Sequence, residues 1–257
     1  MKKLIFLIFV IWSAVLTYAQ PSEKILIAAA SDLKFAMDSI VLVFKKEHPG
    51  IDINVTYGSS GKLYEQISHS APFDFFFSAD NEYPISLKKN GFTISEVYPY
   101  GIGRIVIWSK QFDPNRTGIN ILLDKDVLKI SMANPKHAPY GKRAEEALKF
   151  YKVYEGVSSK LVYGENISQA AQFVTAGAAD IGIIALSLAL SPTMKKHIGH
   201  YYVIPEASHR RLEQGFVMLK HAEHNSLAPM FRDFVLSKQA TDILSYFGFA
   251  KINKGGS

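Results

Sequence analysis

Four short segments place serines or small residues where a strand-like run gives way to a helix-like run. They are Ala30-Ser31-Asp32, Gly58-Ser59-Ser60-Gly61, Pro139-Tyr140-Gly141 and Asn166-Ile167-Ser168. The first N–H groups of a helix have no intrahelical partner and, with the helix dipole, bind anions without a formal positive charge. Ordinary N-capping explains each segment taken alone equally well. Because small residues surround the serines of the first two segments, the pattern predicts an α/β protein with a candidate anion site.

Two enzyme motifs based on similar residues do not fit. A P-loop needs four residues between its glycines and Ser or Thr after the Lys, whereas Gly58-Ser59-Ser60-Gly61-Lys62-Leu63 has two and then Leu63. A nucleophile elbow needs glycine at the position of Lys62. The histidines, including His137, have no spacing that ties one to a serine or pairs two on a helix face. We therefore predict no catalytic residue, no metal ion and no cofactor.

The elements that must position these segments alternate along the chain. Continuous apolar runs at 24–30 and 181–185 predict strands buried on both faces. Further strands are predicted at 51–57, 73–77, 102–108, 129–132, 160–162, 201–204 and 212–219. Helices are predicted at 33–44, 62–68, 85–89, 141–151, 168–176, 228–236 and 240–246. Two series of alternating strands and helices predict an α/β protein with mainly parallel sheets in two lobes.

The first residues have the order of a secretory signal peptide. Lys2 and Lys3 precede an apolar run from Leu4 to Leu16, and Ala19 ends the segment before a polar stretch. We predict that residues 1–19 are a signal peptide cleaved after Ala19, because the run is shorter than the ~20 residues of a membrane span. The sequence has no cysteine, and its net charge of +6 is spread among acidic neighbours. This charge pattern argues against nucleic-acid binding.

At these segments the chain resembles the molybdate-binding protein family (ModA), the periplasmic component of molybdate importers. The resemblance runs from Lys24 to Phe249, and its strongest pieces are Ala28-Ala29-Ala30-Ser31, Gly58-Ser59-Ser60-Gly61, residues 71–80 and residues 134–141. It implies a two-lobed type II periplasmic-binding-protein fold with the ligand in the interlobe cleft. The expected division is residues 20–100 and 206–257 in lobe 1 and residues 101–205 in lobe 2, with crossings near 100–104 and 205–211.

The resemblance also implies which residues hold the anion. Ser31 and Ser60 match positions that offer hydroxyl and N–H groups from lobe 1, and Tyr140 and Ile167 match positions that offer backbone N–H groups from lobe 2. Ser59 is a further candidate that orients the turn. One departure is at Ala185, where many family members carry a tyrosine that reaches the anion. We expect Ser187 or a water molecule to substitute for that hydroxyl.

The hydrogen-bond donors of the expected site limit which anions it can bind. A site made only of donors suits a fully deprotonated dianion, whereas phosphate near neutral pH keeps a proton that needs an acceptor. Asp32 is the nearby acceptor, and we interpret it as the N-cap of the following helix. Sulfate has the right charge but shorter bonds than molybdate. In a cleft sized for the larger anion, the hydrogen bonds to sulfate would therefore be too long.

The expected function is capture of molybdate or tungstate in the periplasm and delivery to an ABC transporter permease in the inner membrane. We expect a monomer that is not an enzyme. Two alternatives stay open: a binding protein for another oxyanion such as sulfate or phosphate, and a serine hydrolase. The sequence does not separate molybdate from tungstate.

Overall fold

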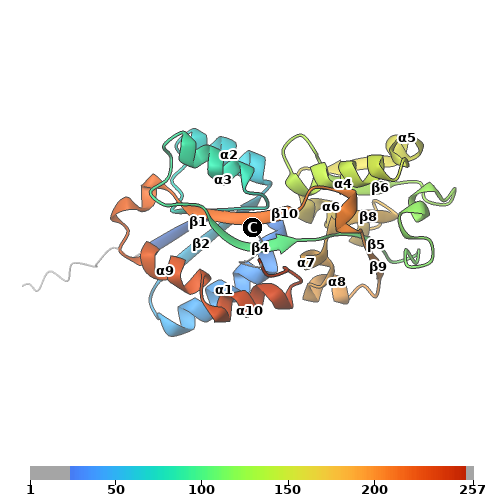
Figure 1. The fold of residues 1–257 in the computed structure, drawn as a ribbon. Helices are drawn as coiled ribbons and strands as arrows, with labels where there is room; N and C mark the ends of the chain where they lie inside the picture. The colour runs from blue at the N-terminus through green and yellow to red at the C-terminus, as the bar shows by residue number, and fades with distance from the viewer. Residues whose placement is uncertain (1–23, 253–257) are drawn as a thin grey trace, which may run out of the picture.

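Two five-stranded sheets, each flanked by helices, form two lobes that lie side by side (Figure 1). The computed structural model describes residues 24–252 of the 257-residue chain. The predicted signal peptide lies outside these residues. Lobe 1 here means the lobe that contains the first sheet, and lobe 2 the lobe that contains the second.

Both sheets are mixed but mainly parallel. The first has the order β2-β1-β3-β10-β4, with β1 (Lys24–Ala30), β2 (Asp52–Gly58), β3 (Phe75–Ser78), β4 (Tyr98–Gly103) and β10 (Leu212–Met218). The second has the order β7-β6-β8-β5-β9, with β5 (Ile105–Ser109), β6 (Ile130–Ala133), β7 (Leu161–Gly164), β8 (Ile181–Ala185) and β9 (His200–Val203). Only β10 and β5 run against their neighbours among the described strands. The predicted α/β fold with two mainly parallel sheets is confirmed.

Helices follow most of the strands, as the alternation predicted. Lobe 1 carries α1 (Lys34–Glu47), α2 (Ser60–Ser68), α3 (Glu82–Lys89), α9 (Leu227–Val235) and α10 (Lys238–Tyr246). The helices that follow the strands of the second sheet are α4 (Pro139–Phe150), α5 (Tyr154–Val157), α6 (Ile167–Thr175), α7 (Leu186–Ala189) and α8 (Pro192–Lys195). Short 3-10 helices cover Ser31–Leu33, Gly118–Leu123, Ser158–Lys160, Glu206–Ser208 and Lys220–His224.

Each lobe has its own hydrophobic core. In lobe 1, Phe44 of α1 packs edge-on against Phe231 of α9, which in turn packs edge-on against Phe75 of β3. The C-terminal helices therefore close the face of the first sheet that α1 also covers. In lobe 2, Trp108 and the continuous apolar strand β8 are almost fully buried. Burial of this apolar surface is the main force that holds each lobe together.

The chain passes between the lobes twice. Strand β4 ends at Gly103 in the first sheet and β5 begins at Ile105 in the second, so the prediction of one strand over residues 102–108 is wrong. The break arises because the chain changes sheets at Arg104. It returns between β9 and β10. The division of the chain into lobes is still a prediction. Because β4 extends to Gly103 in the first sheet, we now place the first boundary between the lobes at Arg104 instead of after residue 100.

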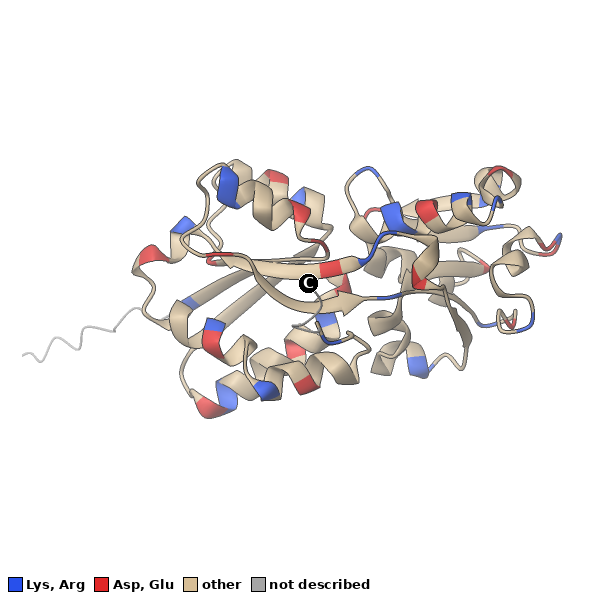
Figure 2. Cartoon of the chain, in the orientation of Figure 1, with Lys and Arg blue, Asp and Glu red and all other residues tan. Residues whose placement is uncertain are grey.

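Basic and acidic residues are interspersed along the elements of both lobes (Figure 2). Among residues 24–252, none of the helices combines the length and the apolar composition of a membrane-spanning segment.

Candidate functional site

One small pocket lies where the predicted segments meet between the lobes. Its volume is at most about 180 Å³, below the ~300–1,000 Å³ of sites for drug-sized ligands. It is lined by residues of both lobes: Ala30, Ser31, Asp32, Gly58, Ser59, Ser60 and Ala79 from lobe 1, and Ala138, Pro139, Tyr140 and Ile167 from lobe 2. The structure thus brings all five predicted site residues to one place. No lysine or arginine is among these lining residues.

Ser60 offers a hydroxyl hydrogen to this pocket. It is the first residue of α2 and is 1 % exposed. Its Oγ accepts a hydrogen bond from the backbone N–H of Ala79 at 3.0 Å. No acceptor for the hydroxyl hydrogen is found among the described residues, so that hydrogen is available to a ligand.

Ser31 joins the two lobes at the edge of the pocket. Its hydroxyl donates to Oδ1 of Asn166 at 3.2 Å, and the hydroxyl of Ser168 donates to the Ser31 carbonyl at 2.9 Å. Asn166 is also the N-cap of α6, because its Oδ1 accepts from the N–H of Gln169. The side chain that caps α6 therefore also holds the Ser31 hydroxyl at the edge of the pocket.

Tyr140 and Ile167 contribute backbone groups from helix starts. They are the second residue of α4 and the first of α6, so their N–H groups have no partner within their own helices. Pro139, the first residue of α4, suits a helix start because its ring fixes φ. Gly141 is required for the close approach of α4 to β6, since a Cβ there would lie 2.2 Å from the Ala133 carbonyl oxygen.

Ser59 of lobe 1 contacts His137 of lobe 2. Sequence reasoning missed this pair. Its Oγ lies 2.9 Å from Nδ1 of His137, and the His137 carbonyl accepts from the N–H of Gly61 at 2.9 Å. Burial, with repulsion from Lys62, lowers the pKa of His137, so the ring is neutral at pH 7. No carboxylate hydrogen-bonds to the other ring nitrogen within residues 24–252, so the third member of a catalytic triad is not found there.

The interpretation of Asp32 as a helix N-cap is wrong. It is the second residue of the 3-10 helix Ser31–Leu33, and its side chain makes no capping bond. Its carboxylate is 1 % exposed and accepts a hydrogen bond from Nε2 of Gln214 at 2.9 Å, while Oδ1 has no hydrogen-bond partner among the described residues. Burial raises the pKa of Asp32 to about 6, against the lowering effect of the Gln214 bond.

Ser187 does not fill the position of the tyrosine that Ala185 replaces. Ala185 is fully buried at the end of β8, and the Ser187 hydroxyl donates to the backbone carbonyl of Asp32 at 2.8 Å. This serine therefore links the lobes, and its hydrogen is already used.

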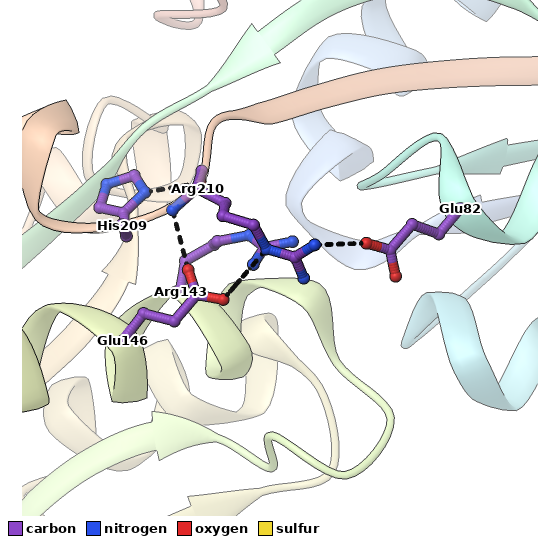
Figure 3. Close-up of polar contacts among 5 residues, drawn as sticks. All are labelled: Glu82, Arg143, Glu146, His209 and Arg210. Atoms are coloured by element: carbon purple, nitrogen blue, oxygen red, sulfur yellow. Dashed lines mark hydrogen bonds and ion pairs between the residues drawn. The ribbon is translucent and has the colours of Figure 1, made fainter.

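A charged bridge joins the lobes away from the pocket (Figure 3). Arg210, between β9 and β10, lies 3.1 Å from Glu82 of α3 and donates its backbone N–H to Glu146 of α4 at 2.8 Å. Glu146 also pairs with the buried Arg143. The Arg210 and Glu82 side chains are more than half exposed, and such pairs contribute at most about 1 kcal/mol each.

Sequence reasoning also missed Gln214. It is fully buried in β10, in a strand that is otherwise apolar apart from Glu213 and Gly215. A glutamine inside an otherwise apolar strand could have indicated a buried hydrogen-bond network, because buried polar side chains need partners. Its partners are remote in sequence, so no spacing identifies them. Within residues 24–252, no group of three His, Asp or Glu side chains could hold a metal ion.

Comparisons with known proteins agree on the type of protein. Residues 25–250 match the family model described as bacterial extracellular solute-binding protein. The chain is 32 % identical over 205 residues to the molybdate-binding protein ModA of Rhodobacter capsulatus, which covers 79 % of each chain. It is 31 % identical to ModA of Azotobacter vinelandii, covering 95 % of this chain and 96 % of that protein.

A solved structure is similar over nearly the whole chain. The periplasmic molybdate-binding protein of Azotobacter vinelandii superposes with a TM-score of 0.81 at 25 % identity, covering 90 % of this chain and 99 % of that one. The two-lobed periplasmic-binding-protein fold expected from the sequence is therefore confirmed.

Proposed function

The chain belongs to the bacterial extracellular solute-binding proteins, and within them to the ModA family, and we propose on that basis that it captures molybdate between its lobes for an ABC importer. Its relatives in this family are solute-binding proteins, so the protein is not an enzyme. The serine hydrolase alternative has lost its support, since the one Ser–His pair found, Ser59 and His137, has no orienting carboxylate among the described residues.

The observation that carries the proposal is the convergence of uncharged donors on one small pocket. The hydroxyls of Ser31 and Ser60 and the first-turn N–H groups of Tyr140 and Ile167 come from four different helix starts in two lobes. Helix starts stabilise an anion through their N–H groups and dipoles. Four such starts aimed at one pocket suit a small anion with several oxygens.

Ligand selection follows from what the pocket offers. Molybdate and tungstate are dianions without a proton at neutral pH, and a set of donors satisfies them fully. Phosphate brings a proton that needs an acceptor. The one carboxylate that lines the pocket is Asp32, whose Oδ2 accepts from Gln214 and whose Oδ1 has no partner among the described residues, so phosphate is the competitor that the titration must test. Sulfate has shorter bonds and stretches the same hydrogen bonds. We propose molybdate and tungstate as the ligands, with sulfate and phosphate as the competitors to exclude.

A calorimetric titration of the mature protein with the four oxyanions tests the function. Molybdate and tungstate are expected to bind one ion per chain. At a hundredfold excess over Kd, each adds about 2.7 kcal/mol of stability and raises the melting temperature by several degrees. Sulfate and phosphate at the same concentration are expected to shift it little. Equal stabilisation by phosphate would reassign the ligand and make Asp32 the acceptor of its proton.

The remaining parts of the proposal concern location and partners. The relatives are extracellular or periplasmic solute-binding proteins. We propose that residues 1–19 are a cleaved signal peptide and that the mature protein works as a monomer with an inner-membrane permease. Intact-mass measurement on a periplasmic fraction is expected to give a chain that begins at Gln20. A mass that retains Met1–Ala19 would refute cleavage, and light scattering would detect a stable dimer.

A further inference from the structure

A buried hydrogen-bond network lies directly behind the anion pocket. Gln214 of β10 is fully buried, and its Nε2 donates to Asp32 Oδ2 at 2.9 Å and to the Tyr140 hydroxyl at 3.1 Å. Its Oε1 accepts from the Tyr100 hydroxyl at 2.6 Å, and Tyr100 also lies within 3.1 Å of the Ser78 carbonyl. All polar atoms of the Gln214 side chain therefore have partners.

Within this network, the hydrogen bond from Gln214 to Tyr140 crosses from one lobe to the other, and the Tyr140 hydroxyl also lies beside the Asp32 carboxylate. Gln214, Asp32 and Tyr100 belong to lobe 1, whereas Tyr140 is at the start of α4 in lobe 2. Tyr140 is 2 % exposed, and burial together with the nearby Asp32 carboxylate raises the pKa of its hydroxyl far above the physiological range. The bond therefore joins a neutral phenol to a neutral amide.

The backbone at the first crossing is shaped around this bond. Gly103 is the last residue of β4, and a Cβ there would lie 2.3 Å from the Tyr140 hydroxyl and 2.5 Å from Gln214 Nε2. Only glycine leaves room for both groups. The first crossing of the chain between the lobes therefore lies beside the hydrogen bond between Gln214 and Tyr140.

Tyr140 connects this network to the ligand. Its backbone N–H is in the first turn of α4 at the pocket, while its hydroxyl is held by Gln214. When the lobes separate, the Tyr140 hydroxyl leaves Gln214, and an amide N–H that was paired must find water. The bond therefore favours the closed arrangement, in which the N–H of Tyr140 faces the groups of lobe 1.

We infer that Gln214 is a positioning residue that holds the Tyr140 hydroxyl and thereby stabilises the closed arrangement in which the anion is bound. This inference rests on the proposed function for the identity of the anion but not for the closure itself. The Tyr140 side chain therefore contributes to the site in addition to the backbone N–H that lies at the pocket. Gln214 itself does not line the pocket.

Two variants separate this role from a merely structural one. Tyr140→Phe removes one hydroxyl, and Gln214→Met keeps a similar volume without hydrogen-bonding groups. Each is expected to weaken molybdate binding about tenfold in calorimetry, because a buried partner is left unpaired in the closed state. In the double variant the two losses are expected not to multiply. Tyr246→Phe, on the exposed face of α10, is the matched control.

A measurement without ligand distinguishes failure of the inference from failure of the proposed function. Because the sequence has no cysteine, two spin labels can be placed at exposed Lys89 in lobe 1 and Glu155 in lobe 2. Double electron–electron resonance spectroscopy is expected to show a longer distance between the two spin labels in Tyr140→Phe than in the parent chain. Arg210→Ala, which removes the exposed bridge, is expected to change the affinity by less than about fivefold.

The outcomes decide between the claims. If the parent chain ignores molybdate but the distances still lengthen in Tyr140→Phe, the ligand is wrong and the inference stands. If Tyr140→Phe folds, keeps the parent distances and binds molybdate within twofold of the parent, Gln214 has no role in closure and the inference is overturned.

Discussion

Replacement of both Ser31 and Ser60 by alanine is expected to weaken molybdate binding by at least about a hundredfold. Each hydroxyl is placed to donate to a charged ligand, and such hydrogen bonds contribute about 1.5–3 kcal/mol each. Their combined loss of about 3–6 kcal/mol corresponds to a weakening between about a hundredfold and more than ten-thousandfold. Both serines line one pocket and donate to the same anion, so the difference between the double-variant loss and the sum of the single losses measures their coupling. Calorimetric titration of the single and double variants measures this directly.

A matched control separates lost donors from lost stability. Ser60→Ala also deprives the Ala79 N–H of its acceptor, so some loss of melting temperature is expected without ligand. The control is the double variant of Ser39 and Ser245, whose hydroxyls donate to carbonyls of their own helices. It is expected to bind as the parent does. Near-parental affinity in the Ser31 and Ser60 double variant would show that the anion is held elsewhere.

The elements most predictable from the sequence were those whose environment is uniform. Strands β1 and β8 begin and end where the apolar runs at 24–30 and 181–185 predict, because strands buried on both faces need apolar side chains throughout. The helix starts at Ser60 and Ile167 were also visible, since small and capping residues mark them. These local signals predicted only an anion site. The family resemblance selected the five candidate residues, which the structure brings to one pocket.

The contacts between lobes could not be predicted in the same way. Gln214 and Tyr140 are 74 residues apart, and Ser59 and His137 are 78 apart. Such pairs depend on how two separately folded cores dock, and no periodicity within one element encodes that. The break at Arg104 was missed for a related reason: apolar residues continue on both sides of it, although they belong to different sheets.

Asp32 shows how a local interpretation fails when the long-range partner is unknown. An aspartate after a strand and before a helix is usually a cap. Here the carboxylate turns instead to Gln214 and is buried without a positive partner, since none of the ion pairs of residues 24–252 includes Asp32. A buried, unpaired carboxylate is costly when ionised. That cost is the source of the pH dependence expected of this protein.

The Asp32→Asn variant is expected to be more stable than the parent chain at pH 8 and equally stable at pH 4. Burial raises the pKa of Asp32 from 3.8 to about 6, so between these values the folded state binds more protons than the unfolded state. The free energy of unfolding of the parent therefore falls as pH rises through this window, by about 3 kcal/mol in all, and is level above it. Asparagine keeps an acceptor for Gln214 without the charge, and the neighbouring phenols of Tyr100 and Tyr140 stay neutral throughout because burial raises their pKa values.

Urea denaturation at pH 4, 6 and 8, with the exposed Asp126→Asn as control, measures the difference in the free energy of unfolding between variant and parent. A difference that is the same at all three pH values would mean that Asp32 titrates in the folded protein as it does in the unfolded chain, and that its burial is relieved by water.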